Sequence, residues 1–399
     1  MNANQGLFHD VLVVELASVL AGPSVGQFFA EMGATVLKVE NIKTRGDVTR
    51  SWKVSSEPAE DTVSAYFSAA NWGKKSLCVD LSVPRVQAMV HQIIGQADIV
   101  LVSFKPGDAE KLRMDYKTLA QLNPRLLYGH ITGYGSGEPR AGYDAVLQAE
   151  AGFMFLNGEK DGGPLKMPVA LIDLMAAHQL KEGVLAALYS REKTGKGQYL
   201  EVSLLRAAVA SLANQATNYL VAGSAPVRMG SEHPNIMPYG TVFKTADQKE
   251  LVLAIGDDRQ FQALCGLLGK PELAQEPAYK TNRQRVKHRG ELNEELAKLI
   301  SGHERETLLQ ALIDHHVPAG AVNTVPEALA QPLAQPQLFS LEAVAGAGVR
   351  QVAFDGPAVP ALALAPPPVL GQHTHEILQK MAGVTEQELE EMIQAGLIL

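Results

Sequence analysis

Asp173 lies in the segment MPVALIDLMAAH (167–178), at the junction between an apolar run and a predicted helix. An acidic side chain at such a junction is a candidate for a chemical role. Aspartate is a preferred N-cap residue, so capping alone accounts for Asp173. The N-terminus of a helix also stabilises an ionised carboxylate, and an ionised carboxylate can act as a nucleophile. Pro168 and the apolar flank indicate burial, and a buried carboxylate without a paired cation needs a reason. Asp173 is therefore a candidate nucleophile, with capping as the alternative.

Two loops place polar side chains among glycines or prolines. The first, GYGSGEPRAGYD (133–144), contains Tyr143 and is either a long connector or a mobile active-site loop whose glycines expose backbone amides to a ligand. The second, GSEHPNIMPYG (230–240), contains His233 and Tyr239, and its prolines stiffen it in a way that suits substrate positioning. A lone histidine in a loop is more often an ordinary surface residue.

Basic residues flank several predicted strands: Lys43, Arg45, Lys74, Lys75, Lys105 and Lys111. Each alone is ordinarily a solvated charge, but together they are expected around one edge of the sheet, where an anionic nucleotide could be held. The turn after the first predicted strand, ASVLAGP (17–23), lacks the GxGxxG pattern, so a standard dinucleotide site is not expected. Glu40 ends the second predicted strand and could mimic a ribose-binding acid, although a surface acid is the better interpretation.

Several functional classes lack support in the sequence. HExxH, paired CxxC, GxxxxGK[ST] and GxSxG patterns are absent, which argues against metal-dependent hydrolysis, nucleoside triphosphate use and serine-esterase chemistry. The net charge of −8 comes without a block of like charge, which argues against nucleic acid as a partner. No apolar run could span a bilayer, and MNANQGLFHD lacks the features of a secretory signal. Cys78 and Cys265 lie among apolar residues and are interpreted as buried, inert thiols. We expect a cytoplasmic enzyme without a metal or a membrane partner.

The elements that must position these residues are predicted from periodicity. Short apolar runs rich in β-branched residues predict buried strands at 11–16, 35–40, 76–81, 97–104 and 126–133. Helical stretches lie between them, and a long apolar helix followed by a short strand and another helix is predicted after Asp173. Alternating strands and helices predict an α/β fold with a doubly wound parallel sheet, which binds ligands outside the carboxyl ends of its strands.

The composition changes near residue 223, and a chain of 399 residues is too long for one ordinary core, so two domains are expected. The segment 242–256 predicts a β-hairpin that turns around 247–249, with helical stretches to about residue 315. A proline-rich, extended segment is predicted over 348–374, and an amphipathic helix closes the chain.

Several segments together resemble the class III CoA-transferase family (CaiB/BaiF type). They are residues 15–40 (ELASVLAGPSVGQFFAEMGATVLKVE), 46–52 (GDVTRSW), 71–81 (NWGKKSLCVDL), 97–107 (ADIVLVSFKPG), 122–135 (LNPRLLYGHITGYG), 167–178, 194–205 (TGKGQYLEVSLL) and 317–329 (VPAGAVNTVPEAL). Matches in the right order over most of the chain are far more specific than a single motif.

The resemblance implies an interlocked homodimer, in which each chain threads through a ring formed by the other. It also implies a large Rossmann-like domain built from both chain ends (1–200 and 317–399), a linker helix (201–225) and a smaller α+β domain (226–316). Within the family, the aspartate that matches Asp173 attacks an acyl-CoA thioester. Coenzyme A is then a substrate, and no metal or other cofactor is implied.

The resemblance also implies contacts for CoA. The turn Ser18-Val19-Leu20-Ala21 matches the CoA-contacting turn, and Lys75, Phe104 and Lys111 match positions that line the CoA site. Asn41 replaces an arginine common in the family, so Lys43 or Arg45 is expected to take its phosphate-binding role, with Lys105 nearby. The expected contacts to the carboxylic acid come from Leu20, Trp52, Tyr143, His233 and Tyr239.

The substrate class follows from departures within the family. Oxalate-type members carry a glutamine where this chain has Leu20, and their four-glycine loop is replaced by the segment 230–240. This segment resembles members that use succinyl-CoA and a dicarboxylate. Racemases of the same fold carry GHD where this chain has GYD (142–144), and tyrosine is a poor proton acceptor at neutral pH, which favours transfer. A racemase-type enzyme and a non-catalytic CoA-binding protein remain the alternatives.

Overall fold

The computed structural model describes residues 6–340, 347–356, 359 and 364–399, so part of the predicted proline-rich segment lies outside the described residues. The chain divides into two compact units. The first comprises Met1–Ala151, Met167–Ala213 and Pro336–Leu399, and the second comprises Gly152–Lys166 and Asn214–Gln335.

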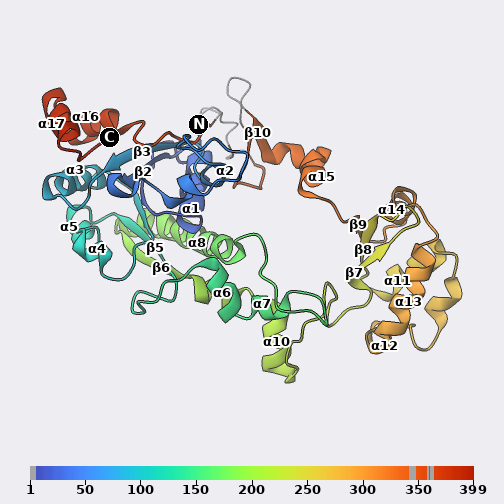
Figure 1. The fold of residues 1–399 in the computed structure, drawn as a ribbon. Helices are drawn as coiled ribbons and strands as arrows, with labels where there is room; N and C mark the ends of the chain where they lie inside the picture. Colours follow the sequence, from blue (N-terminus) through green and yellow to red (C-terminus); the bar gives the residue numbers. More distant parts are fainter. Residues whose placement is uncertain (1–5, 341–346, 357–358, 360–363) are drawn as a thin grey trace. The chain divides into compact units, whose positions relative to one another are not determined.

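A six-stranded parallel sheet forms the centre of the first unit, in the order β3-β2-β1-β4-β5-β6 (Figure 1). Its strands are β1 (Leu12–Leu16), β2 (Thr35–Asn41), β3 (Lys74–Val79), β4 (Ile99–Val102), β5 (Leu127–Thr132) and β6 (Gln198–Ser203). This is the order of a doubly wound sheet, with its switch point between β1 and β4. The predicted α/β class and the predicted strands are confirmed.

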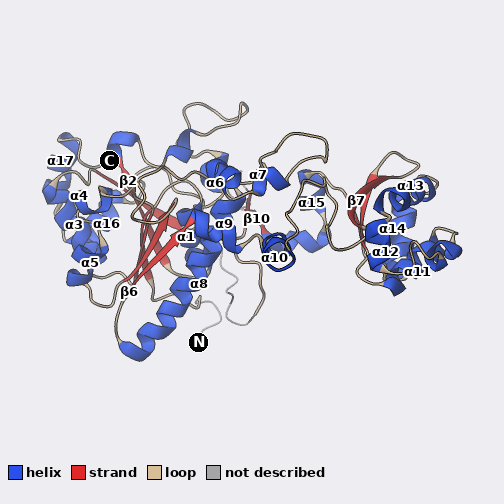
Figure 2. Cartoon of the chain, turned by 90° about the horizontal axis from the view of Figure 1, so that it is seen from below, coloured by secondary structure: helices blue, strands red, loops and turns tan. Residues whose placement is uncertain are grey.

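Helices cover both faces of this sheet, as Figure 2 shows. One face packs against α1 (Ala21–Glu31) and α8 (Leu171–Thr194), and the other against α3 (Pro84–Ile94), α5 (Tyr116–Leu122) and α16 (Thr374–Ala382). The second face forms a core in which Val14, Leu37 and Val100 from the strands meet Ile93 and Ile377 from the helices. Alternate strand residues therefore supply the two faces, as strand geometry requires.

The last residues of the chain complete the first unit beside β3. The helix α17 (Glu386–Gln394) follows α16, its residues Leu389 and Met392 join the same core, and Ile398 forms an antiparallel bridge with Val79. The other helices of this unit are short: α2 (Ala65–Ser68), α4 (Asp108–Lys111), α6 (Asp144–Glu150) and α9 (Leu204–Ala210). The strands β10 (Leu338–Ser340) and β11 (Ala347–Val349) form a separate antiparallel pair.

The second unit has its own antiparallel sheet, in the order β7-β8-β9. The strands β7 (Tyr239–Lys244) and β8 (Glu250–Ala254) form the predicted hairpin, and β9 is Ala319–Ala321. Its helices are α7 (Phe153–Leu156), α10 (Ala213–Ala222, which begins in the first unit), α11 (Asp258–Leu267), α12 (Asn282–Lys287), α13 (Arg289–Ile300), α14 (Arg305–Asp314) and α15 (Val325–Ala330). A separate core contains Phe243, Leu253, Phe261 and Leu296.

The fold tests the predictions made for the two cysteines and for Lys74. Cys78 and Cys265 are both free and buried, as predicted. Lys74, expected in a loop, is instead the first residue of β3 and is fully buried against Glu15. Its ion-pair partner lies 59 positions away in the sequence, so local sequence could not show that this lysine enters the strand. Within the described part of the chain, no helix combines the length and apolar character needed to cross a membrane.

Candidate active site

Asp173 lies in the first turn of α8, where it is the third helical residue rather than the cap. Ala170 occupies the cap position and no side chain caps this helix, so the capping interpretation is wrong. The Asp173 side chain is only 7% exposed, and it has no hydrogen-bond or ion-pair partner among the described residues. It lines a cavity of about 210 Å³ at the carboxyl end of the sheet. A buried, unpaired carboxylate that faces a cavity is unexplained by folding alone.

The carboxyl group of Asp173 is held in an environment that disfavours its charge. Burial, together with the negative charge of Asp144, raises the pKa of Asp173 from 3.8 to about 7. Asp144 is fixed in place, because its Oδ1 accepts the Ile172 amide at 2.8 Å and its Oδ2 accepts the Gln148 side-chain amide at 2.7 Å. Burial and this second carboxylate act against the stabilisation of the ionised form that the helix N-terminus was expected to give.

The glycine-rich loop forms one wall of this cavity, which supports its interpretation as an active-site loop. Gly133, Gly135, Glu138, Arg140, Ala141, Gly142, Tyr143 and Asp144 all contribute to the lining. The loop closes on itself at its base, where a Cβ atom added to Gly142 would lie 2.2 Å from the Cα atom of Gly133. Only glycine allows two backbone segments to approach so closely.

The turn after β1 forms another wall. Ser18, Val19, Ala21 and Gly22 line the cavity, whereas Leu20 is buried and is not among its lining residues. The Ser18 amide donates to Ser103 Oγ at 3.1 Å, and the Val19 amide donates to Asp47 at 3.2 and 3.3 Å. These two amides are committed to the protein. The amides of Ala21 and Gly22, in the first turn of α1, have no acceptor within the helix.

A second cavity of about 220 Å³ lies at the carboxyl ends of β1 and β2. Ser18 and Phe104 line both cavities, so the two share a wall. Lys43 is largely exposed at its edge, where Nζ lies 2.8 Å from Asp80 Oδ2 and 2.8 Å from Ser82 Oγ. Of the predicted phosphate-binding residues, Lys43 therefore lines a cavity next to the one that contains Asp173.

The other predicted basic residues are dispersed. Lys105 lines the first cavity, and its ammonium group has no ion-pair partner in the described part of the chain. Arg45 follows the short 3-10 helix Ile42–Thr44, and Lys111 ends α4, and neither residue lines either of the two cavities. Lys75 lies at the amino end of β3, where it pairs with Glu376 at 3.0 Å. The expectation of one shared edge is wrong for Lys74 and Lys75, because the amino ends of parallel strands lie opposite the carboxyl ends.

The interpretation of Glu40 as a surface acid is wrong. This residue is buried rather than on the surface, and it accepts hydrogen bonds from the Arg50 guanidinium at 2.8 and 2.7 Å and from Ser76 Oγ at 2.6 Å. Burial opposes its ionisation, but these bonds and the nearby Lys38 charge hold the pKa of Glu40 below its ordinary value. A strand-end acid can be buried here because a guanidinium neutralises it.

The predicted contacts to the acid substrate fall into two groups. Tyr143 lines the cavity and is exposed, and Trp52 packs edge-on against Tyr66 with ring centroids 5.1 Å apart. Burial and the charges of Asp173 and Asp144 raise the pKa of Tyr66, but Trp52 and Tyr66 line neither of the two cavities, so contact of Trp52 with substrate stays a prediction. His233 and Tyr239 belong to the second unit, where their rings pack 5.2 Å apart, and their contact with substrate stays a prediction.

The structure also adds residues that the sequence did not indicate. Lys38 and Asp47 form buried ion pairs behind the turn, whereas Asp144 and Gly142, which belong to the predicted glycine-rich loop, line the cavity that contains Asp173. Clusters of three or more potential metal-ligating side chains do not occur within the described ranges. A doubly wound sheet with a buried, unpaired carboxylate beside a cavity near its switch point is an arrangement typical of the active sites of α/β enzymes.

Comparison with known proteins identifies the family. The sequence model of CoA-transferase family III matches residues 8–374. The chain is 39% identical to the succinate–glutarate CoA-transferase of Agrobacterium fabrum over 389 residues, which cover 93% of this chain and 94% of that one. It is 30% identical to the succinyl-CoA–D-citramalate CoA-transferase of Chloroflexus aurantiacus, with 98% and 97% covered. The crystal structure of a CaiB/BaiF family protein from Brucella suis superposes with a TM-score of 0.80 at 36% identity, over 95% of this chain and all of that one.

The chain therefore belongs to CoA-transferase family III, as its sequence motifs indicated. It is an enzyme that transfers coenzyme A between carboxylic acids.

Proposed function

We propose that this enzyme transfers CoA from succinyl-CoA to a second dicarboxylic acid, with Asp173 as the nucleophile. The observation that carries the proposal is the buried Asp173 carboxylate, which faces a cavity and has no partner among the described residues. Relatives named for succinate, glutarate and citramalate support the choice of dicarboxylates. The proposal includes an interlocked homodimer in the cytoplasm, with the large domain built from both chain ends, and no metal or cofactor besides CoA.

The reaction proceeds through covalent intermediates on one carboxylate. An Asp173 oxygen attacks the thioester carbon of succinyl-CoA, and CoA thiolate leaves to give a mixed anhydride. The thiolate then attacks the aspartyl carbonyl, which forms an aspartyl-CoA thioester and releases succinate. The acceptor carboxylate attacks this thioester and expels the thiolate again. Attack of the thiolate on the acceptor's acyl carbon forms the new acyl-CoA and restores the Asp173 carboxylate.

The cavities suggest how the two substrates are held. The second cavity takes the nucleotide end of CoA, and Lys43 exchanges its exposed contact with Asp80 for a phosphate group. The first cavity takes the thioester, and the helix-start amides of Ala21 and Gly22 are suited to stabilise the oxyanion of each tetrahedral step. Lys105 and Arg140 line the same cavity, and one of them holds the distal carboxylate of the acid together with Tyr143.

The test is to incubate the enzyme with succinyl-CoA and a panel of mono- and dicarboxylic acids, and to follow new acyl-CoA species by mass spectrometry. We expect new thioesters with dicarboxylates, and none with the Asp173→Ala variant. Transfer only to monocarboxylates would refute the proposed acceptor class. Deuterium incorporation at the α-carbon of a 2-methylacyl-CoA, without transfer, would establish a racemase instead.

A further inference from the structure

Val19 has an unusual backbone conformation for its residue type. Its φ is +72°, in the left-handed region that β-branched residues rarely adopt. Val19 lies in the turn between β1 and α1 and lines the cavity that contains Asp173. Such a conformation persists only where the surroundings enforce it.

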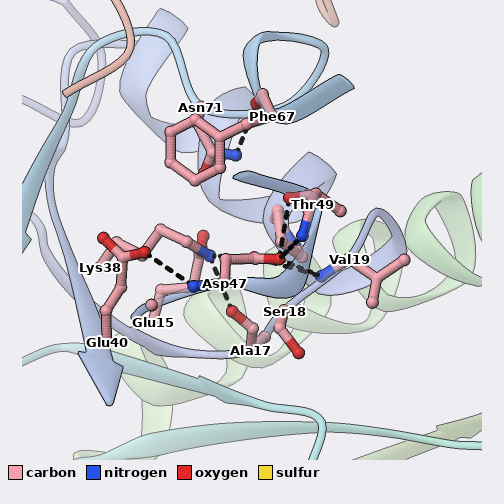
Figure 3. A network of polar contacts seen from close by, with 12 residues as sticks. Glu15, Ala17, Ser18, Val19, Lys38, Glu40, Asp47, Thr49, Phe67 and Asn71 are labelled. Atoms are coloured by element: carbon pink, nitrogen blue, oxygen red, sulfur yellow. Dashed lines mark hydrogen bonds and ion pairs between the residues drawn. The ribbon is translucent and has the colours of Figure 1, made fainter. Parts of the chain in front are cut away.

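The side chain of Asp47 supplies the constraint. Its two oxygens both accept the Val19 amide, at 3.3 and 3.2 Å, across 28 positions of sequence (Figure 3). Asp47 is itself fixed, because Oδ1 also accepts the Thr49 amide at 3.0 Å and the Thr49 hydroxyl at 2.8 Å. The Asp47 carboxylate, which accepts the Val19 amide, is therefore held rigidly.

Lys38 of β2 ties Asp47 to the start of the same turn. Its Nζ lies 2.9 Å from Asp47 Oδ2 and donates to the Ala17 carbonyl at 2.9 Å. It also pairs with Glu15 Oε1 at 3.0 Å, and all three side chains are at most 1% exposed. One ammonium group thus joins both ends of the segment Ala17–Val19.

The ion network behind the turn is balanced in charge. The second oxygen of Glu15 pairs with Lys74 at 2.7 Å, so two carboxylates meet two ammonium groups. Taking these four charges out of water costs much of what their attraction returns, so a buried network of this kind is weak evidence for stability. The main effect of this network is therefore to fix the geometry of the turn.

We infer that Asp47 and Lys38 are positioning residues for CoA binding, because they hold Val19 in the left-handed conformation. This conformation directs the chain into α1, whose first residues Ala21 and Gly22 line the cavity. The inference rests on the proposed function only in taking this turn as the site that contacts CoA.

A double-mutant cycle tests the inference through the Kd of free CoA, measured by titration calorimetry, so that the acid substrate need not be known. Asp47→Ala is made in the wild-type chain and in the Val19→Gly background, because glycine adopts a positive φ without cost. We expect Asp47→Ala to raise the Kd about tenfold in the wild-type chain and about threefold or less in the Val19→Gly background, each relative to its own parent. A factor of ten equals about 1.4 kcal/mol, which is the size of the cost of the left-handed conformation.

Two further variants test whether Asp47 positions the turn for CoA binding or only stabilises the fold. Asp47→Asn retains the shape and one carbonyl oxygen, so it is expected to fold and to weaken CoA binding by a smaller factor in the wild-type chain only. Asp115→Asn is the matched control, because Asp115 also accepts the amide and hydroxyl of a threonine, Thr118, but lines neither cavity. Its Kd for CoA is expected to stay within about twofold of the wild type.

The outcomes are distinct. Equal losses in the two backgrounds, or no loss from either Asp47 variant, would overturn the inference while the transferase proposal stands. Absence of CoA binding by the wild-type protein would instead refute the proposed function itself.

Discussion

Replacing Asp173 with asparagine is expected to stabilise the protein at alkaline pH while abolishing CoA transfer. The pKa of Asp173 is about 7 in the folded protein, against an ordinary value of 3.8. Between these values the folded state binds more protons than the unfolded state, so stability falls as the pH rises toward about 7. A pKa raised by about 3 corresponds to about 4 kcal/mol in total. Allowing for relaxation around the charge, we expect about 2 kcal/mol of this loss between pH 5 and pH 8, and asparagine avoids it.

The assay is thermal unfolding of the parent and the variant across this pH range. We expect the Tm advantage of Asp173→Asn to grow by roughly 4 °C between pH 5 and pH 8, at about 2 °C per kcal/mol for a protein of this size. Asp115→Asn is the control. Burial opposes ionisation of Asp115, but the hydroxyl and amide of Thr118 outweigh burial and lower its pKa, so Asp115 is ionised in both states across the range. Its effect on Tm is therefore expected to be independent of pH. If the Asp173 variant showed the same pH-independent difference, the argument from a buried charge would fail.

Three further measurements probe Asp173, the glycine-rich loop and the second cavity. The value of kcat/KM is expected to rise with pH up to about 7 as Asp173 ionises, and Asp144→Asn should move this limb to lower pH because it removes a negative charge; an unmoved limb would contradict the assignment. Gly142→Ala should lower kcat/KM at least tenfold, because its Cβ would lie 2.2 Å from backbone, whereas Gly137→Ala, with no atom within 4 Å, should stay within about twofold. Lys43→Gln should raise the KM for succinyl-CoA about fivefold with little change in kcat, and an equal fall in kcat would argue against a binding role.

The sheet could be predicted because each strand has a distinctive local sequence. The runs at 11–16, 35–40 and 126–133 are apolar and β-branched, and the intervening helices leave parallel pairing as the simple solution. The exceptions are charged residues inside the strands. Lys38 and Lys74 are buried because Glu15 on β1 neutralises them, and this pairing depends on neighbours that only the sheet order brings together.

Part of the lining of the Asp173 cavity could be predicted from the sequence, but its electrostatics could not. Asp173 stood out by its position after an apolar run, and the turn at Ser18 and Val19 was indicated by resemblance to a family. The raised pKa of Asp173 depends on its burial and on Asp144, which precedes it by 29 positions and is carried by another helix. The role of Asp47 is likewise nonlocal, since its carboxylate reaches back across 28 positions to the Val19 amide.

The raised pKa of Asp173 also fits the chemistry that a CoA-transferase must perform. A carboxylate that binds its proton more tightly is a stronger nucleophile toward a thioester than an ordinary aspartate. With a pKa of about 7, roughly half of the enzyme is ionised at neutral pH, so the gain in reactivity costs only about twofold in the active form. In the proposed mechanism, the same burial that destabilises the folded protein makes Asp173 a better nucleophile, and active-site carboxyl groups often have a pKa shifted toward the working pH in this way.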